Sequence, residues 1–179
     1  MTTTSQSLRA IVLATALACG AAGAAPSKLQ IQGYSAAVPA GWVAQEPSSS
    51  MRVAQFALPG TKDAEVAAFF FPPGQGGNHE ANILRWSSQF FGADGKAGKP
   101  TVSTHKAGDT EVTLVELKGK YARGIGMGQQ GDAKANQTLL VAMVETPVGR
   151  ITLQIYGPTK QVTAQRANFL ALAQSFKRG

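Results

Sequence analysis

The nine residues Gln137–Glu145, with the sequence QTLLVAMVE, decide the fold of this chain. Six of them, Leu139 to Val144, are apolar and show no polar alternation. A strand of this kind has two dry faces, so it lies inside a sheet with other elements packed on each side. Turn-forming residues flank the stretch at Gly131–Asp132 and Thr146–Gly149, which leaves it too short for a typical helix. The sequence therefore predicts a buried central strand.

Two segments have the apolar periodicity of amphipathic helices. The first is capped by Asn78, carries Glu80 in its first turn and runs to about Phe91. Its apolar face contains Ile83, Trp86, Ser87 and Phe90. The second begins with Thr159 as its cap and places the basic pair Lys177–Arg178 at its C-terminal pole. Its apolar stripe contains Val162, Phe169, Leu172, Ala173 and Phe176.

The remaining segments resemble strands and turns. Strands are expected at 27–32, 34–38, 51–58, 64–71, 101–106, 110–121 and 150–156. Pro39 and Gly41 predict a turn that delivers Trp42 into the core. Because the strands cluster around two helices, we expect an α+β fold in which an antiparallel sheet is sandwiched between helices, in one domain.

The N-terminus has the order of a secretory signal peptide. Arg9 precedes the nine-residue apolar run Ala10–Ala18, and small residues fill 20–25. We expect residues 1–24 to be removed by cleavage between Ala24 and Ala25, which leaves 25–179 as one globular domain. The expected location is the periplasm of a bacterium or the medium outside it.

Cys19 suggests an alternative, namely that the exported protein carries a lipid anchor. It is the single cysteine of the chain, and Ala18 supplies the small residue that precedes a lipidated cysteine in bacterial lipoproteins. In that case Cys19 would be acylated, and the protein would be anchored to the envelope. Otherwise the cysteine leaves with the signal peptide, and the mature chain has neither disulfides nor thiol chemistry.

The charge of the chain is basic but dispersed. Seventeen lysines and arginines against ten acidic residues give a formal net charge of +7. Lys118, Lys120 and Arg123 are the nearest approach to a cluster. A solvated surface explains this pattern better than a nucleic-acid patch does, so we expect no nucleic-acid partner.

No catalytic or cofactor motif in the sequence has the structural context that its chemistry needs. The segment Gly126–Gly131 matches G-x-G-x-x-G, but a buried strand follows it where a dinucleotide site needs a helix. His79 and His105 are far apart and lack metal-ligand spacing. Glu111 and Glu116 stand at an odd and an even position of one strand, so their side chains point to opposite faces and cannot form a catalytic pair. We therefore expect no cofactor, no metal and no enzyme activity. An enzyme would need a cleft in which His79 or His105 meets a carboxylate.

Arg85 and Trp86 are the candidate partner contacts, since arginine and tryptophan are common binding anchors. The alternative interpretation places Trp86 in the core with Arg85 covering its rim. A second functional alternative is a small-molecule binding module with a cleft at a sheet end, rimmed by Trp42 or Trp86.

Together these segments resemble the Mog1/PsbP-like fold of small exported bacterial proteins, including PsbP-like and DcrB-like envelope proteins. The resemblance is carried by VPAGW at Val38–Trp42, the strand at Met51–Arg52, ANILRW at Ala81–Trp86 and the helix after Gly157–Thr159. It implies an antiparallel sheet sandwiched between helices. Its relatives are mostly non-enzymatic accessory subunits of photosynthetic complexes, binders of small GTPases and envelope proteins.

The expected function is therefore a non-catalytic envelope protein that binds a protein partner or supports an assembly. We expect a monomer. Contact with a membrane is expected only if Cys19 is acylated.

Overall fold

The protein folds as strands, one helix, further strands and a final helix, as predicted. The structure is a computed structural model that describes residues 28–108, 110–122 and 133–179. Its elements are β1 (Lys28–Ile31), β2 (Tyr34–Ala37), β3 (Val43–Gln45), β4 (Arg52–Ala57), β5 (Glu65–Phe71), α1 (His79–Ser87), β6 (Phe90–Phe91), β7 (Thr101–Ala107), β8 (Thr110–Tyr121), β9 (Lys134–Thr146), β10 (Gly149–Pro158), α2 (Thr159–Gln174) and β11 (Lys177–Arg178). The expected signal peptide, Cys19 and the glycine-rich segment Gly126–Gly131 lie outside the described residues.

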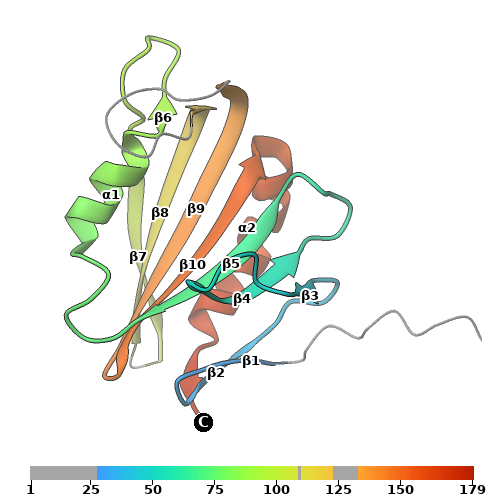
Figure 1. The fold of residues 1–179 in the computed structure, drawn as a ribbon, viewed down its shortest axis with the longest axis vertical. Coiled ribbons are helices and arrows are strands. Elements are labelled where there is room, and N and C mark those ends of the chain that lie inside the picture. The colour runs from blue at the N-terminus through green and yellow to red at the C-terminus, as the bar shows by residue number, and fades with distance from the viewer. Residues whose placement is uncertain (1–27, 109, 123–132) are drawn as a thin grey trace, which may run out of the picture.

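An antiparallel sheet forms the body of the molecule (Figure 1). Its strand order is β3-β4-β5-β10-β9-β8-β6, and β7 pairs with β8 on the side away from β9. The predicted strands pair as the hairpins β4–β5, β7–β8 and β9–β10. Strand β9 lies between β10 and β8, which confirms the central position predicted for Leu139–Val144.

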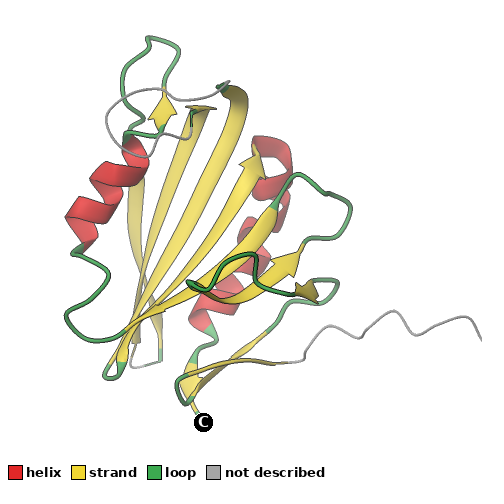
Figure 2. Cartoon of the chain, in the orientation of Figure 1, coloured by secondary structure: helices red, strands yellow, loops and turns green. Residues whose placement is uncertain are grey.

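Both faces of β9 are dry because a helix lies over each side of the sheet. Leu140, Ala142 and Val144 belong to the core under α2. The alternate residues of the strand, Leu139, Val141 and Met143, belong to a second core with Trp86 of α1. In Figure 2 the two helices lie on opposite sides of the yellow sheet. The predicted α+β sandwich is therefore confirmed.

The core under α2 is the larger of the two and contains the predicted helix stripe. Phe169 and Leu172 are fully buried against Ile151 and Leu153 of β10. Trp42 joins this core from the turn that Pro39 begins, where Trp42 N donates to Pro39 O at 3.3 Å. Gly41 has a φ of 82°, which the turn requires and which glycine adopts without strain.

A second, three-stranded sheet, with order β1-β2-β11, was not predicted. Helix α2 ends at Gln174, so Lys177 and Arg178 do not occupy its C-terminal pole, and that prediction was wrong. They pair with Ser35 and Tyr34 of β2, while Phe176 turns into the core at 2% exposure. This arrangement buries the Phe176 ring and gives β2 a second hydrogen-bonded neighbour.

Two helix boundaries also differ from the sequence prediction. Helix α1 ends at Ser87 and not near Phe91, because Phe90 and Phe91 form β6 against Tyr121 and Lys120. Phe90 is still fully buried, as its apolar character required. At α2 the cap is Pro158, which offers no side-chain hydrogen bond. Thr159 is the first helical residue, and its hydroxyl accepts from Thr138 Oγ1 at 2.9 Å.

Helix α1 covers only part of its side of the sheet. It packs on β6 and β8, whereas in the described part of the chain no helix lies over β3, β4 and β5 on that face. The boundary between the covered and the open half falls along β10. No helix among the described residues has both the length and the apolar character to cross a membrane.

Candidate functional site

Helix α1 is short, and its sequence places aromatic and cationic side chains at the boundary of the open half. Asn78 Oδ1 accepts from Ala81 N at 2.8 Å and fixes the first turn, as predicted. This register buries Trp86, which is 4% exposed, and turns Leu84 outward, which is 64% exposed. Arg85 lies between the inward-facing Trp86 and the outward-facing Leu84, and its side chain is exposed.

The guanidinium of Arg85 is held in place from two sides. It lies over the Trp86 ring, with Cζ 5.6 Å from the ring centroid. Its Nη2 donates to Asn82 Oδ1 at 2.9 Å. Asn82 is itself fixed, because its Nδ2 donates to the carbonyls of Gly76 and Asn78. Arg85 is therefore an exposed side chain with a restricted conformation.

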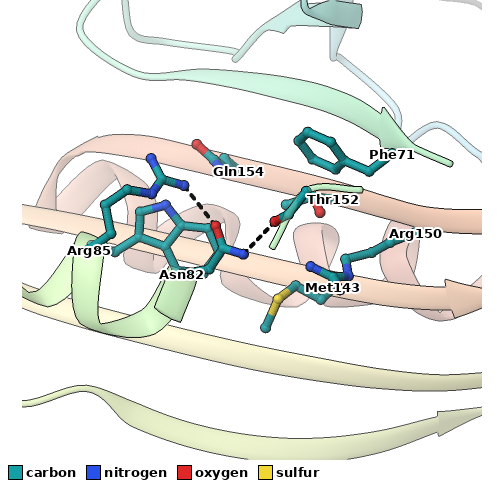
Figure 3. A pocket seen from close by; sticks show the side chains of 9 residues that line it. Phe71, Asn82, Arg85, Met143, Arg150, Thr152 and Gln154 are labelled. Atoms are coloured by element: carbon teal, nitrogen blue, oxygen red, sulfur yellow. Dashed lines mark hydrogen bonds between the residues drawn. The ribbon is translucent and has the colours of Figure 1, made fainter. Parts of the chain in front are cut away.

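A shallow hollow with about 20 Å³ of enclosed space and a mouth open to solvent lies between α1 and β10 (Figure 3). Figure 3 shows Arg85 and Arg150 at its two ends with Asn82 between them. It is lined by Phe71, Gly76, Asn82, Arg85, Trp86, Met143, Arg150, Thr152 and Gln154. Aromatic walls with polar groups between them are typical of binding sites.

Two polar side chains of β10 face the hollow without using their hydrogen-bonding groups internally. Thr152 and Gln154 share a face of β10 with Arg150, since alternate residues of a strand point the same way. Among the described residues, neither the Thr152 hydroxyl nor the Gln154 amide has a side-chain hydrogen-bond partner. The half-buried Gln154 amide is therefore open to a ligand, whereas the Thr152 hydroxyl is largely buried beneath the hollow.

A polar clamp fastens the start of α1 to the β9–β10 hairpin. Glu145 and Arg150 face each other across the hairpin, with Arg150 Nε 2.6 Å from Glu145 Oε1. His79 Nε2 lies 2.7 Å from the same carboxylate oxygen, and Arg150 Nη1 donates to Gly77 O at 3.0 Å. The clamp sets the distance between α1 and β10 and so the width of the hollow.

Opposing influences act on the Glu145 carboxyl. Partial burial is the largest of them and raises its pKa, because burial disfavours charge. The hydrogen bonds from His79 and Arg150, with the positive charge of Arg150, together outweigh burial and lower the pKa below its ordinary value. The carboxylate is therefore charged throughout the neutral range.

Acidification is expected to loosen the N-terminal turn of α1. Because the pKa of Glu145 is lowered in the folded protein, its charge stabilises the fold above the unfolded-state pKa. This stabilisation is lost as the pH falls through the pKa of Glu145 in the folded protein, which lies below the ordinary pKa of a glutamate. Amide hydrogen exchange of Ala81 and Asn82, whose N–H groups donate to Asn78, measures the loss of protection when it is followed down the pH scale and corrected for intrinsic rates.

The variant Glu145→Gln serves as the control for this expectation. It removes the titrating group, so the amides of α1 should show weaker protection at neutral pH and a smaller change on acidification. Equal pH dependence in the two proteins would contradict a role for Glu145 in holding α1.

The two predicted histidines lie in different surroundings. His79 does meet a carboxylate, Glu145, which the sequence did not indicate. His105 lies on β7, where its Nε2 is 2.9 Å from Ser103 Oγ. Within the described ranges no group of three His, Cys, Asp or Glu side chains could hold a metal ion. Glu116 faces α2 and pairs with Arg166, on the face opposite Glu111, as its parity predicted.

The two tryptophans do not share a cleft. Trp42 is fully buried in the core under α2, and its Nε1 donates to Gln165 Oε1 at 3.0 Å. It therefore rims no cavity, which removes it from the predicted small-molecule site. Trp86 belongs to the core on the other side of the sheet but also lines the hollow with Arg85.

Sequence reasoning missed the β10 side of the site. Thr152, Gln154, Arg150 and Glu145 carry no motif. Their signal lies in the hairpin register: a turn at 147–148 places Arg150 opposite Glu145 and puts Thr152 and Gln154 on the face of β10 opposite Ile151 and Leu153. Because α1 packs on that same face, the hollow forms between the helix and these β10 side chains.

Comparisons with known proteins identify the fold. No family model matches the sequence, and no curated protein sequence matches it. The solution structure of cyanobacterial PsbP (CyanoP) from Synechocystis sp. PCC 6803 is similar, with a TM-score of 0.57, 14% sequence identity, and 90% of this chain and 97% of that chain covered. The Ran-binding protein Mog1p from Saccharomyces cerevisiae is similar with a TM-score of 0.50, 9% identity, and coverage of 87% and 96%. The chain therefore has a Mog1/PsbP-like fold.

Proposed function

We propose that this protein is a non-catalytic, exported envelope protein that binds a partner protein through α1 and the hollow beside it. The observation that carries the proposal is the Arg85–Trp86 pair, an exposed guanidinium held over a buried indole at 5.6 Å. Export rests on the signal-peptide pattern of residues 1–24. If Cys19 is acylated instead, the same surface is presented from a lipid anchor.

The composition and rigidity of the surface support a role in protein binding. Arginine and tryptophan are enriched among residues that dominate binding energy. Because Asn82 and Trp86 already restrict Arg85, a partner would lose less side-chain entropy when it immobilises the guanidinium. Leu84 adds an apolar group that is 64% exposed one residue away. A rigid cation beside an exposed leucine suits a protein contact.

The size of the hollow favours a protein side chain over a metabolite. Ligand pockets typically enclose about 300–1,000 Å³ and bury most of the ligand. The enclosed part of the hollow measures about 20 Å³, which is room for about one water molecule, and the rest is open to solvent. Its open mouth can meet the end of a partner side chain, whereas a metabolite could not be enclosed. The yeast protein that shares this fold is a Ran-binding protein, so the fold also supports recognition of proteins.

Photo-crosslinking from α1 tests the proposal in cells that produce the full chain. The variant Leu84→benzoylphenylalanine places a photoreactive group on the outer face of the helix. Irradiation is expected to give one discrete higher-mass band, and fractionation is expected to place that band outside the cytoplasm. The soluble or membrane fraction then separates free protein from lipid-anchored protein.

The matched control is Lys160→benzoylphenylalanine, on an exposed position of α2 at the other face of the sheet. A discrete product from Leu84 and none from Lys160 supports α1 as the contact. The absence of a discrete product from Leu84, or a cytoplasmic location of the protein, refutes the proposal.

A further inference from the structure

We infer that the hollow between α1 and β10 binds the carboxylate of an aspartate or glutamate side chain on the partner protein. This inference rests on the proposed function and names the chemistry of the partner. It follows from the kind of hydrogen-bonding groups around the hollow, from their charge, and from the apolar groups on either side.

The unused groups around the hollow can all donate hydrogen bonds. Arg85 uses only Nη2 within the described protein, so its Nε and Nη1 keep their hydrogens free. The Gln154 amide and the Thr152 hydroxyl add further donors on the opposite wall. A carboxylate has two oxygens that accept several hydrogen bonds and fits the planar fork of an arginine. The Gln154 oxygen and the Thr152 hydroxyl can also accept, so Arg85, which only donates, is the group that selects an anion.

The charge at this site is not balanced within the described protein. Arg52, Arg150 and Arg166 each form an ion pair with a glutamate. Arg85 has no carboxylate partner among the described residues, although it is held by two contacts. Trp86 on one side also reduces the contact of the guanidinium with water, which strengthens its attraction for an anion. A partner carboxylate supplies the missing counter-charge.

The surroundings favour a side chain within a polypeptide over a free acid. Phe69 and Phe71 stack at 6.5 Å with their rings 11° apart on the β5 side, where both are half-buried. Leu84 is exposed on the α1 side. These apolar groups lie on two sides of the hollow, so residues before and after an inserted carboxylate can contact them.

Nuclear magnetic resonance titration of the mature protein tests the inference with defined probes. N-acetyl-glutamate N-methylamide is expected to shift the Trp86 indole N–H and the Arg85 Nε–H signals saturably. The glutamine analogue has the same shape without the charge, and we expect it to bind about tenfold to hundredfold more weakly. Equal binding of the two probes, or no saturable shift, overturns the inference.

Variants assign the response to the site. Arg85→Gln should abolish the shift of the Trp86 signal, and Gln154→Leu should weaken binding several-fold by removing one donor. Lys160→Gln removes the same charge from α2 and should leave binding unchanged. Thermal unfolding of each variant shows that it is folded. Retained binding in Arg85→Gln, or equal loss in Lys160→Gln, overturns the assignment.

Two further outcomes separate this inference from the proposed function. Acetate or a peptide C-terminus binding more tightly than the glutamyl probe overturns the assignment to a side chain. A protein captured from Leu84 with no response to the glutamyl probe refutes the inference and leaves the proposed function standing. Saturable glutamyl binding with no captured protein supports the pocket chemistry and refutes the proposed partner.

Discussion

Trp42→Ala is expected to lower the free energy of unfolding by about 3–5 kcal/mol, since truncation of a fully buried aromatic removes its burial and leaves a cavity. Trp42 links the turn after β2 to the core under α2, where its ring contacts Phe56 at a centroid distance of 6.1 Å. The loss therefore affects the sheet and the helix together. Urea unfolding followed by circular dichroism measures it.

Trp42→Phe separates packing from hydrogen bonding. The phenyl ring retains much of the contact with Phe56, but the hydrogen bond from the indole Nε1 to Gln165 Oε1 is lost. Asn168 Nδ2 still donates to that oxygen at 3.0 Å, so it is not left unsatisfied. The expected loss is about 1–3 kcal/mol, between wild type and alanine. A loss below about 1 kcal/mol for the alanine variant would contradict the described packing.

Gly149→Ala is expected to destabilise the protein by about 2–5 kcal/mol, through a strained backbone and a steric clash. Gly149 begins β10 with a φ of 136°, which residues with a side chain rarely adopt. A Cβ at this position would clash with the carbonyl oxygen of Phe71 on β5. Because backbone cannot rotate away as a flexible side chain can, β5 and β10 would have to separate. Thermal unfolding measures the loss.

Gly74→Ala is the matched control. Gly74 also has a positive φ, 76°, but nothing lies within 4 Å of the Cβ that alanine would add. Its expected cost is backbone strain alone, about 1–2 kcal/mol. The difference between the two variants isolates the close approach of β10 to β5. Equal losses would show that the approach is less tight than described.

The sequence predicts the architecture where a periodic pattern is carried by many residues. The unbroken apolar run Leu139–Val144 can be satisfied only between two layers, and both layers are present. Val162, Phe169 and Leu172 similarly define the buried side of α2. These patterns are robust because exposing any one of the elements would leave several large apolar side chains in water.

Boundaries and the site were less predictable because they depend on single long-range contacts. Phe90 fits the periodicity of α1 but lies in β6, where its ring contacts that of Tyr121 at a centroid distance of 5.0 Å. Lys177 and Arg178 fit a helix terminus, yet β2 offers them an open edge. The candidate contacts Arg85 and Trp86 could be singled out by residue type. Gln154 could not, because its position beside the hollow depends on where α1 lies on the sheet.

The small sheet β1-β2-β11 has a consequence for how this chain folds. Strand β2 receives its second neighbour only from Lys177 and Arg178, and the C-terminal Gly179 N donates to Gly33 O at 2.9 Å. Phe176 enters the core from the same segment. The small sheet therefore forms only when segments from opposite ends of the described region meet. Because pairing between segments far apart in the sequence carries a loop-closure cost, this sheet is expected to complete late in folding.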